Sequence, residues 1–210
     1  MDGMSPPSYQ ARVKQTIVTL DLEGVLVPEI WIAVAEQTGI EALRRTTRDE
    51  PDYDVLMRQR LEILAEHNLK LSDIQRVIGT LLPLEGAKEF LDELRVRTQV
   101  IILSDTFKQF ASPLMEKLGW PTLFCNHLEV RDDVVVNYHL RQPDQKRQSV
   151  VAFKSLNYEV IAAGDSYNDT TMLAEAHRGI LFRAPDNVKQ EFPQFPAVEK
   201  YDELMAAIFE

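Results

Sequence analysis

The chain has 210 residues, 45% of them hydrophobic and 27% charged, so it can bury a sizeable core and is not a disordered chain. Its length suits one domain, or one domain with a modest insertion. A net charge of -10 argues against a nucleic-acid partner, because such binding depends on Lys and Arg at the phosphates. No apolar run is long enough to span a bilayer, so no membrane partner is expected.

The first fifteen residues contain Pro6-Pro7 and few apolar side chains. They lack the apolar stretch of a secretory signal, and the chain has a single cysteine, Cys125. Both features favour a cytoplasmic protein. We interpret residues 1–14 as a loose N-terminal extension. A homodimer is compatible with the sequence.

Three short apolar runs each end at an acidic or hydroxyl residue. These runs, with the residues that follow them, are Thr16–Leu20 with Asp21, Gln99–Leu103 with Ser104 and Asp105, and Val160–Ala163 with Gly164 and Asp165. Such runs are typical of buried parallel strands. Helical segments near 86–97, 107–118 and 168–176 alternate with them, which predicts an open α/β fold with a central parallel sheet. In such folds ligands lie beyond the carboxyl ends of the strands, where all three polar clusters fall.

The stretch 28–83 departs from this alternation, because it holds no convincing strand. Helices are expected near 28–38, 52–67 and 72–81, the first opened by Pro28 and the third capped by Ser72. We therefore expect a small all-helical cap at 29–83, inserted after the first strand into a core formed by 15–28 and 84–210. Alternating apolar residues between 129 and 141 predict a strand that belongs to a hairpin.

Two carboxylates follow the first expected strand. Asp21 and Glu23 lie two residues apart and precede Gly24, so a turn can aim both at one point. One can attack a phosphorus atom while the other handles protons. Taken alone the pattern is weak, because an ordinary acidic turn explains it better.

A second pair of acids follows the third expected strand. Asp165 and Asp169 stand one helical turn apart, directly after Gly164. Carboxylate oxygens grouped in this way suit Mg²⁺. Helix capping by Asp165 or Ser166, with Asp169 favoured by the helix dipole, is the alternative, but it accounts well for only one acid.

Two further groups would complete a site for phosphoryl transfer. Ser104, at the end of the second strand, can donate to a phosphoryl oxygen. A cation is also needed to offset the phosphoryl charge. The basic residues before the third strand that can supply it are Lys146, Arg147 and Lys154.

The expected second cap helix carries a basic residue on its apolar face. That face is formed by Tyr53, Leu56, Met57, Leu61 and Leu64. Arg60 lies in its middle, where a guanidinium must be paired, reach outward or face a cleft. A structural salt bridge and a clamp for a substrate carboxylate explain it equally well. Glu29 likewise has two explanations. Its carboxylate can interact favourably with the helix dipole, or it can be the counter-charge of a substrate ammonium group.

The motif order resembles a known superfamily. Asp-x-Glu-Gly at Asp21, Ser-Asp-Thr at Ser104, Lys146 and Gly-Asp-x-x-x-Asp at Asp165 are similar to the four motifs of haloacid dehalogenase-like phosphatases. The resemblance implies a Rossmann-like core in which Asp21 becomes an aspartyl-phosphate, and Lys146 is preferred because its separation from Asp165 is similar to that in phosphoserine phosphatases. It further implies that Mg²⁺ is held by Asp21, the Glu23 carbonyl, Asp165 and Asp169. Glu23 would be the acid and base.

Three stretches, 21–29, 163–173 and 192–196, narrow the resemblance to bacterial phosphoserine phosphatases that also transfer the phosphoryl group to homoserine. It implies O-phospho-L-serine as substrate and L-homoserine as a second acceptor. The substrate-binding residues it implies are Glu29, Arg60, Ser104, Asp105, Lys146 and Asn168. Glu23 departs from the Asp of most family phosphatases, which leaves water and a hydroxyl both open as acceptors. A phosphatase for another small phosphorylated metabolite and a non-catalytic binding protein are the alternatives.

Overall fold

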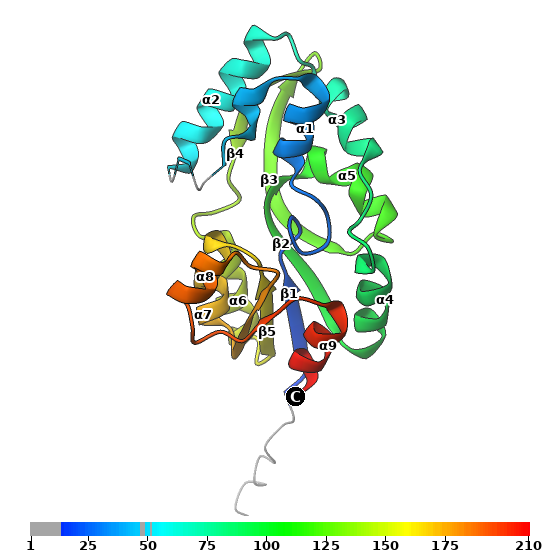
Figure 1. Cartoon of the computed structure of the whole chain (residues 1–210), viewed down its shortest axis with the longest axis vertical. Helices are drawn as coiled ribbons and strands as arrows, with labels where there is room; N and C mark the ends of the chain where they lie inside the picture. The colour runs from blue at the N-terminus through cyan, green and yellow to red at the C-terminus, as the bar shows by residue number, and fades with distance from the viewer. Residues whose placement is uncertain (1–13, 47–48, 51) are drawn as a thin grey trace, which may run out of the picture.

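The computed structural model of the protein describes residues 14–46, 49–50 and 52–210, so the expected N-terminal extension lies, except for Lys14, outside the described residues. Figure 1 shows a layered core at one end of the molecule and a group of helices at the other. Among the described residues, the helices are too short or too polar to cross a bilayer.

Seven strands of the described chain form one sheet, in the order β4-β3-β2-β1-β5-β6-β7. The strands are β1 (Thr16–Leu20), β2 (Gln99–Phe107), β3 (Thr122–Arg131), β4 (Val134–His139), β5 (Glu159–Gly164), β6 (Arg178–Phe182) and β7 (Ala197–Val198). Neighbouring strands run parallel except for β3 and β4, which are antiparallel. This confirms the α/β fold, the parallel sheet and the hairpin.

Strand β1 lies between β2 and β5, so Asp21 and Asp165, which follow β1 and β5, lie at the same edge of the sheet as Ser104. Strand β2 runs on to Phe107 and does not end at Leu103 as expected, so Ser104 and Asp105 lie within it, beyond a register shift after Leu103. Side chains of a strand alternate between its two faces. Val18 and Leu20 accordingly join one buried cluster, whereas Ile17 joins the other. Burial on both faces explains the nearly uniform apolar composition of this strand.

Helices cover both faces of the sheet (Figure 1). They are α4 (Ala87–Arg97), α5 (Lys108–Lys117), α6 (Gln145–Ser155), α7 (Thr170–Glu175), α8 (Asp186–Glu191) and α9 (Tyr201–Phe209), with a short 3₁₀ turn, η2, at Tyr167–Asp169. Buried residues of α4, α5 and α9 belong to the cluster of Val18, whereas those of α6, α7 and α8 belong to the cluster of Ile17. The core is therefore a sheet between two helical layers.

The helices of residues 29–83, here called the cap, are α1 (Ile30–Thr38), η1 (Glu41–Arg44), α2 (Tyr53–Glu66) and α3 (Leu71–Thr80). Two expected boundaries are wrong. Helix α1 begins at Ile30 and not at Pro28. At this start, the Glu23 carboxylate accepts the Ile30 N–H at 2.8 Å. Helix α3 is capped at Lys70 and not at Ser72.

Ser72 has another partner, and it attaches the cap to the β3–β4 hairpin. Its N–H donates to Asp133 Oδ1 at 3.0 Å, and its hydroxyl contacts the other oxygen of that carboxylate at 2.5 Å. The Asp133 carbonyl also accepts the Leu71 N–H at 2.8 Å. On the same side, the Trp31 ring of α1 meets the Phe110 ring of α5 edge-on at 5.3 Å. The cap is thus anchored to elements that follow β2.

Candidate active site

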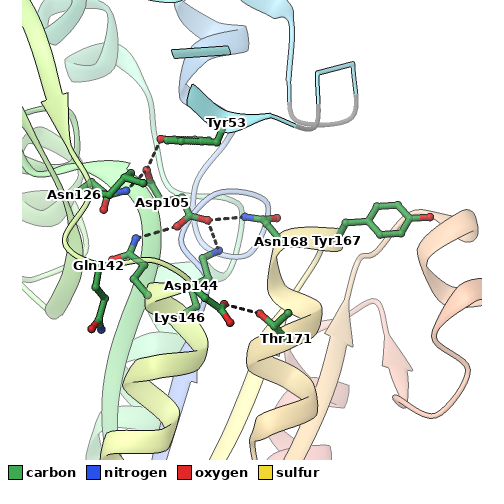
Figure 2. Close-up of a pocket in the computed structure, with 11 residues that line it drawn as sticks. Tyr53, Asp105, Asn126, Gln142, Asp144, Lys146, Tyr167, Asn168 and Thr171 are labelled. Atoms are coloured by element: carbon green, nitrogen blue, oxygen red, sulfur yellow. Dashed lines mark hydrogen bonds and ion pairs between the residues drawn. The ribbon is translucent and has the colours of Figure 1, made fainter. Parts of the chain in front are cut away.

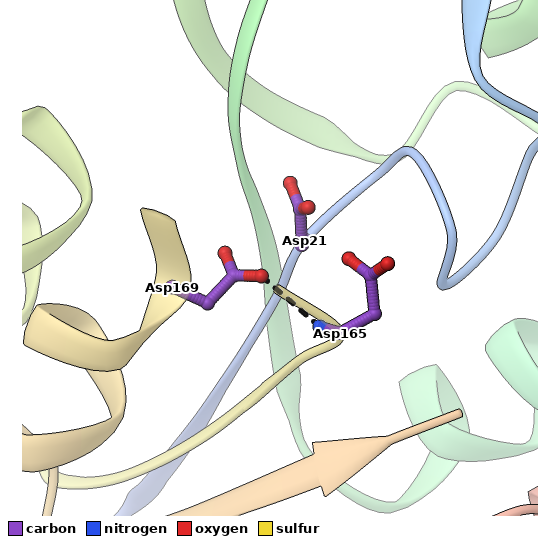
Figure 3. Close-up of side chains that lie close together, drawn as sticks. All are labelled: Asp21, Asp165 and Asp169. Carbon is purple, nitrogen blue, oxygen red and sulfur yellow. Dashed lines mark hydrogen bonds between the residues drawn. The ribbon is translucent and has the colours of Figure 1, made fainter. Parts of the chain in front are cut away.

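Three buried carboxylates converge at the carboxyl edge of the sheet (Figure 3). Asp21 follows β1, Asp165 follows β5, and Asp169 ends the 3₁₀ turn that comes next. Each offers an oxygen within 4.8 Å of the others. The Asp21 N–H donates to the Ala163 carbonyl at 3.0 Å, which fixes the first acid against β5. The structure therefore brings together the acids that the sequence predicted as metal ligands.

Two glycines make this approach possible. Gly24 has a φ of +77°, in the left-handed region, and a Cβ there would overlap the Asp165 carboxylate. A Cβ on Gly164 would likewise overlap the Asp169 side chain. Gly24 is thus required by the close approach of the Asp165 carboxylate, which comes from the second acidic motif. Gly164 is required by the Asp169 side chain of its own motif.

Asp169 serves the local backbone and the cluster together. Its Oδ2 accepts the N–H groups of Asp165 at 3.0 Å and of Ser166 at 3.1 Å. Ser166 is the N-cap of the 3₁₀ turn, so the capping interpretation of this motif is confirmed. The other oxygen, Oδ1, accepts from Lys146 at 2.7 Å. Capping and a place in the acid cluster are therefore not alternatives.

The buried ammonium of Lys146 is the cation of this cluster. Its Nζ lies 2.9 Å from Asp21 Oδ1, 2.7 Å from Asp169 Oδ1 and 3.7 Å from Asp105 Oδ2. Burial alone would lower the pKa of Lys146, but the carboxylates of these three residues raise it well above its ordinary value. The other two candidates lie elsewhere: Arg147 and Lys154 both pair with Glu175.

One ammonium does not neutralise these acids. Burial, reinforced by the charges of Asp169 and Asp165, raises the pKa of Asp21 well above its ordinary value despite Lys146. A divalent cation among the three carboxylates would remove that repulsion. The hard oxygen donors of Asp21, Asp165 and Asp169 fit Mg²⁺ by number and by type.

Ser104 and Asp105 lie in β2 directly after its apolar part, beside the cluster. Ser104 is buried, and its Oγ accepts the Thr106 N–H at 3.2 Å, so the hydroxyl can still donate its hydrogen. The Asp105 carboxylate accepts from Asn168 Nδ2 at 3.1 Å. Burial would raise the pKa of Asp105, but Lys146 and donated hydrogen bonds lower it, so this acid is ionised.

Glu23 is half-buried and lines the same cavity as Asp21 and the cap residues Glu29 and Arg60. Burial and the nearby charge of Glu29 raise the pKa of Glu23 to about 7, although the Ile30 N–H and Arg60 act in the opposite direction. A carboxyl group with this pKa exchanges protons readily near neutral pH.

Arg60 is buried within the cap, and its guanidinium lies 4.5 Å from the centre of the Trp31 ring. Its Nη2 donates to the Arg45 carbonyl at 2.8 Å. Within the described residues its Nε finds no hydrogen-bond partner, and no carboxylate forms an ion pair with it. Burial lowers the pKa of Arg60 to about 10. Arg58, by contrast, points outward to Asp54 at 2.6 Å, as the helical spacing predicts.

A cavity of about 340 Å³ joins the core and cap residues. The predicted site residues that line it are Asp21, Glu23, Glu29, Arg60, Ser104, Asp105, Lys146, Asp165 and Asn168. Asp169 lies behind them, fully buried. The cavity has acidic and basic side chains on the core side and two opposite charges, those of Arg60 and Glu29, on the cap side.

Sequence reasoning missed two buried carboxamides that shape this site. Asn126 of β3 donates to the Asp105 carbonyl at 3.0 Å. Gln145, just before Lys146, donates to the Ser104 carbonyl at 2.7 Å and to Asp105 Oδ1 at 2.9 Å. The position of Asn126 directly after the apolar run 123–125 of β3 was a weak signal, but no local signal distinguished Gln145.

The segment 192–196 packs behind the site. The Phe192 ring meets the Tyr167 ring edge-on at 5.9 Å and stacks on Phe195 at 6.2 Å. The Tyr167 hydroxyl donates to Glu191 at 2.7 Å. This packing supports the turn that presents Asn168 and Asp169.

With this geometry in place, the chain is identified as a member of the haloacid dehalogenase-like hydrolase family, which it matches over residues 15–177. It is 72% identical over 189 residues to the phosphoserine phosphatase ThrH of Pseudomonas aeruginosa, an alignment that covers 90% of this chain and 92% of that protein. A phosphoserine phosphatase of Pseudomonas syringae pv. tomato is 71% identical over 189 residues, covering 90% of this chain and 80% of that protein.

Solved structures agree with the fold. A substrate-bound phosphoserine phosphatase complex superposes with a TM-score of 0.76 at 23% identity, covering 94% of this chain and 99% of that chain. A phospho-aspartyl intermediate analogue of phosphoserine phosphatase gives 0.74 at 23% identity, covering 90% and 95%. The superfamily and the fold predicted from the sequence are confirmed.

Proposed function

We propose that this protein is a phosphoserine phosphatase that works through an aspartyl-phosphate on Asp21, and that it also transfers the phosphoryl group to homoserine. One observation supports the substrate above others. The Arg60 guanidinium is buried without a carboxylate partner among the described residues, in the same cavity as Asp21 and Glu29. A phosphorylated amino acid supplies a carboxylate for Arg60, an ammonium for Glu29 and a phosphoryl group for the core.

The first half-reaction follows from the positions of the acids. Asp21 attacks the phosphorus atom in line and displaces the seryl oxygen. Glu23, with a pKa of about 7, donates its proton to that departing oxygen. Lys146 and Ser104 bind the phosphoryl oxygens, whose charge the ammonium offsets.

The second half-reaction reverses the proton's path. Glu23, now ionised, takes a proton from water or from the acceptor hydroxyl, whose oxygen then attacks phosphorus while the bond to Asp21 breaks. Mg²⁺ held by Asp21, Asp165 and the Glu23 carbonyl, with Asp169 as direct or indirect support, would offset the charge of the phosphoryl oxygens. Asn168 and Asp105 complete the wall beside the phosphoryl group.

The deciding experiment is incubation of the protein with O-phospho-L-serine and Mg²⁺, with and without L-homoserine. Free phosphate and O-phosphohomoserine are then measured, and chelator replaces Mg²⁺ in a parallel reaction. We expect Mg²⁺-dependent phosphate release and, with homoserine, a second phosphorylated product. Turnover of other small phosphomonoesters but not of phosphoserine would instead indicate a phosphatase for another metabolite. Absence of any phosphoryl transfer would leave only a binding role.

A further inference from the structure

A second cavity, of about 480 Å³, lies beside the first (Figure 2). Its rim includes Leu140 and Tyr167, which are 47% and 38% exposed, so it communicates with solvent. Four residues line both cavities, and they are Tyr53, Asp105, Lys146 and Asn168. Lys146 lies deep in the floor, so the other three, here called the partition, separate the aspartyl site from the outer cavity.

The partition is held together by two hydrogen bonds to Asp105 (Figure 2). The Tyr53 hydroxyl, from the cap, donates to the Asp105 carbonyl at 3.1 Å. Asn168, from the 3₁₀ turn after β5, donates to the Asp105 carboxylate at 3.1 Å. Three segments far apart in the chain therefore meet at one residue. The Tyr53 bond is the one that links Asp105 to the cap among the described residues.

Asp105 itself is fixed from the core. Asn126 donates to its carbonyl at 3.0 Å, and Gln145 donates to its carboxylate at 2.9 Å. Tyr53 is thus the member of the partition that the cap contributes. Without the Tyr53 hydroxyl, the Asp105 carbonyl keeps its bond to Asn126, so the loss leaves no buried acceptor unpaired.

The partition bears on which molecule accepts the phosphoryl group from Asp21. An aspartyl-phosphate on Asp21 has two fates. Either water or an acceptor hydroxyl attacks phosphorus, the bond to Asp21 Oδ breaks, and the proton of the attacking oxygen passes to Glu23. Water competes through every opening to solvent, whereas an amino-acid acceptor is held by the cap. A closed site that excludes water therefore favours transfer.

We propose that Tyr53 is a specificity-determining residue, which closes the partition toward the outer cavity and so favours phosphoryl transfer to a hydroxyl over hydrolysis. The proposal rests on the proposed function, because it requires an aspartyl-phosphate formed from phosphoserine. It concerns the fate of that intermediate and not its formation.

The test measures both fates in one reaction. The protein is incubated with O-phospho-L-serine, Mg²⁺ and radiolabelled L-serine, and release of phosphate is compared with entry of label into phosphoserine. Serine is the departing alcohol, so its return needs no assumption about homoserine. The ratio of the two products reports how the intermediate divides and is independent of how tightly phosphoserine binds.

We expect Tyr53→Phe to shift this ratio toward phosphate by about fivefold, because one hydrogen bond across the partition is lost. Tyr53→Ala, which removes the ring, should shift it by about tenfold or more. The matched control is Tyr138→Phe, since Tyr138 also faces the cap through Asp54 but lines neither cavity. That variant should keep the wild-type ratio.

The outcomes are separable. If the wild-type protein consumes no phosphoserine, the proposed function fails, and this inference fails with it. If the wild-type protein is active and both Tyr53 variants keep its ratio, the proposed function stands and the role of Tyr53 is overturned. An equal shift in Tyr138→Phe would also overturn it, because general loosening of the cap would then be the cause.

Discussion

The two walls of the substrate cavity are built differently. On the core wall, the Lys146 ammonium is already surrounded by the carboxylates of Asp21, Asp169 and Asp105. On the cap wall, Arg60 rests against an aromatic ring and a backbone carbonyl, and its Nε has no hydrogen-bond partner in the part of the chain that the structure describes. The core wall is thus organised before substrate arrives, whereas the cap wall has hydrogen-bond donors left for a ligand. The rate of phosphoryl transfer should therefore depend mainly on the core wall, and the choice of substrate should depend mainly on the cap wall.

The largest test of this contrast is Asp21→Asn, which removes the nucleophile from the core wall. Turnover of phosphoserine should fall by about 10⁴-fold or more. Thermal stability should not fall in parallel, because the amide relieves the repulsion that raises the pKa of Asp21. Phosphate release and a thermal melt measure the two effects. Activity close to that of the wild type would remove Asp21 from the mechanism.

A second test compares two of the three basic candidates, Lys146 and Lys154. Lys146→Met should lower kcat by about 10³-fold, since the charge that offsets the phosphoryl group is lost. Lys154→Met is the control, because Lys154 pairs with Glu175 on a half-buried surface and its loss should cost no more than about 1 kcal/mol. Kinetics of both variants at saturating Mg²⁺ decide the matter, and equal losses would contradict the assignment.

The cap wall is tested by Arg60→Ala. We expect KM for phosphoserine to rise by roughly 30- to 100-fold through loss of a charge-assisted bond, with a smaller change in kcat. A phosphomonoester without a carboxylate should be turned over as by the wild type. Arg58→Ala, on the outer face of the same helix, serves as control. If Arg60→Ala left KM unchanged, the carboxylate clamp would be refuted.

The smallest expected effect concerns pH. Burial raises the pKa of Glu23 to about 7, so the carboxyl is protonated below that pH and loses its proton above it. Because the first half-reaction needs the protonated form, kcat/KM for phosphoserine should fall about tenfold per pH unit above 7. In Glu23→Gln the residual activity should be low and should lack this decline. A decline that persists in the variant would belong to another group.

The fold was predictable because its signals are local. The three predicted core strands are short apolar runs followed by polar clusters, and α2 begins within one residue of its expected start. Parallel pairing then determines that Asp21, Ser104 and Asp165 meet. Two helix starts were missed because the acceptors of their N–H groups come from outside each helix. Glu23 accepts the Ile30 N–H of α1, and Asp133 accepts the Ser72 N–H of α3.

The supporting residues of the site could not be read in the same way. Tyr53 looked like one more apolar position on α2, and its hydroxyl finds its partner 52 residues away. Gln145 reaches Asp105 across 40 residues. Such hydrogen-bond partners are determined by how the cap and α6 lie against β2, and this packing cannot be predicted from the spacing of residues along the chain.

The central place of β1 also bears on how the protein folds. Its partners are β2, beyond the whole cap, and β5, farther still along the chain, as the pairings Ile17 with Gln99 and Thr16 with Glu159 show. Contacts of such long separation form late and slowly. Asp21, the proposed nucleophile, is therefore among the first residues of the core in the chain, yet it acquires its surroundings only when nearly all of the core has assembled. Partially folded chains should accordingly have no activity, whatever their helical content.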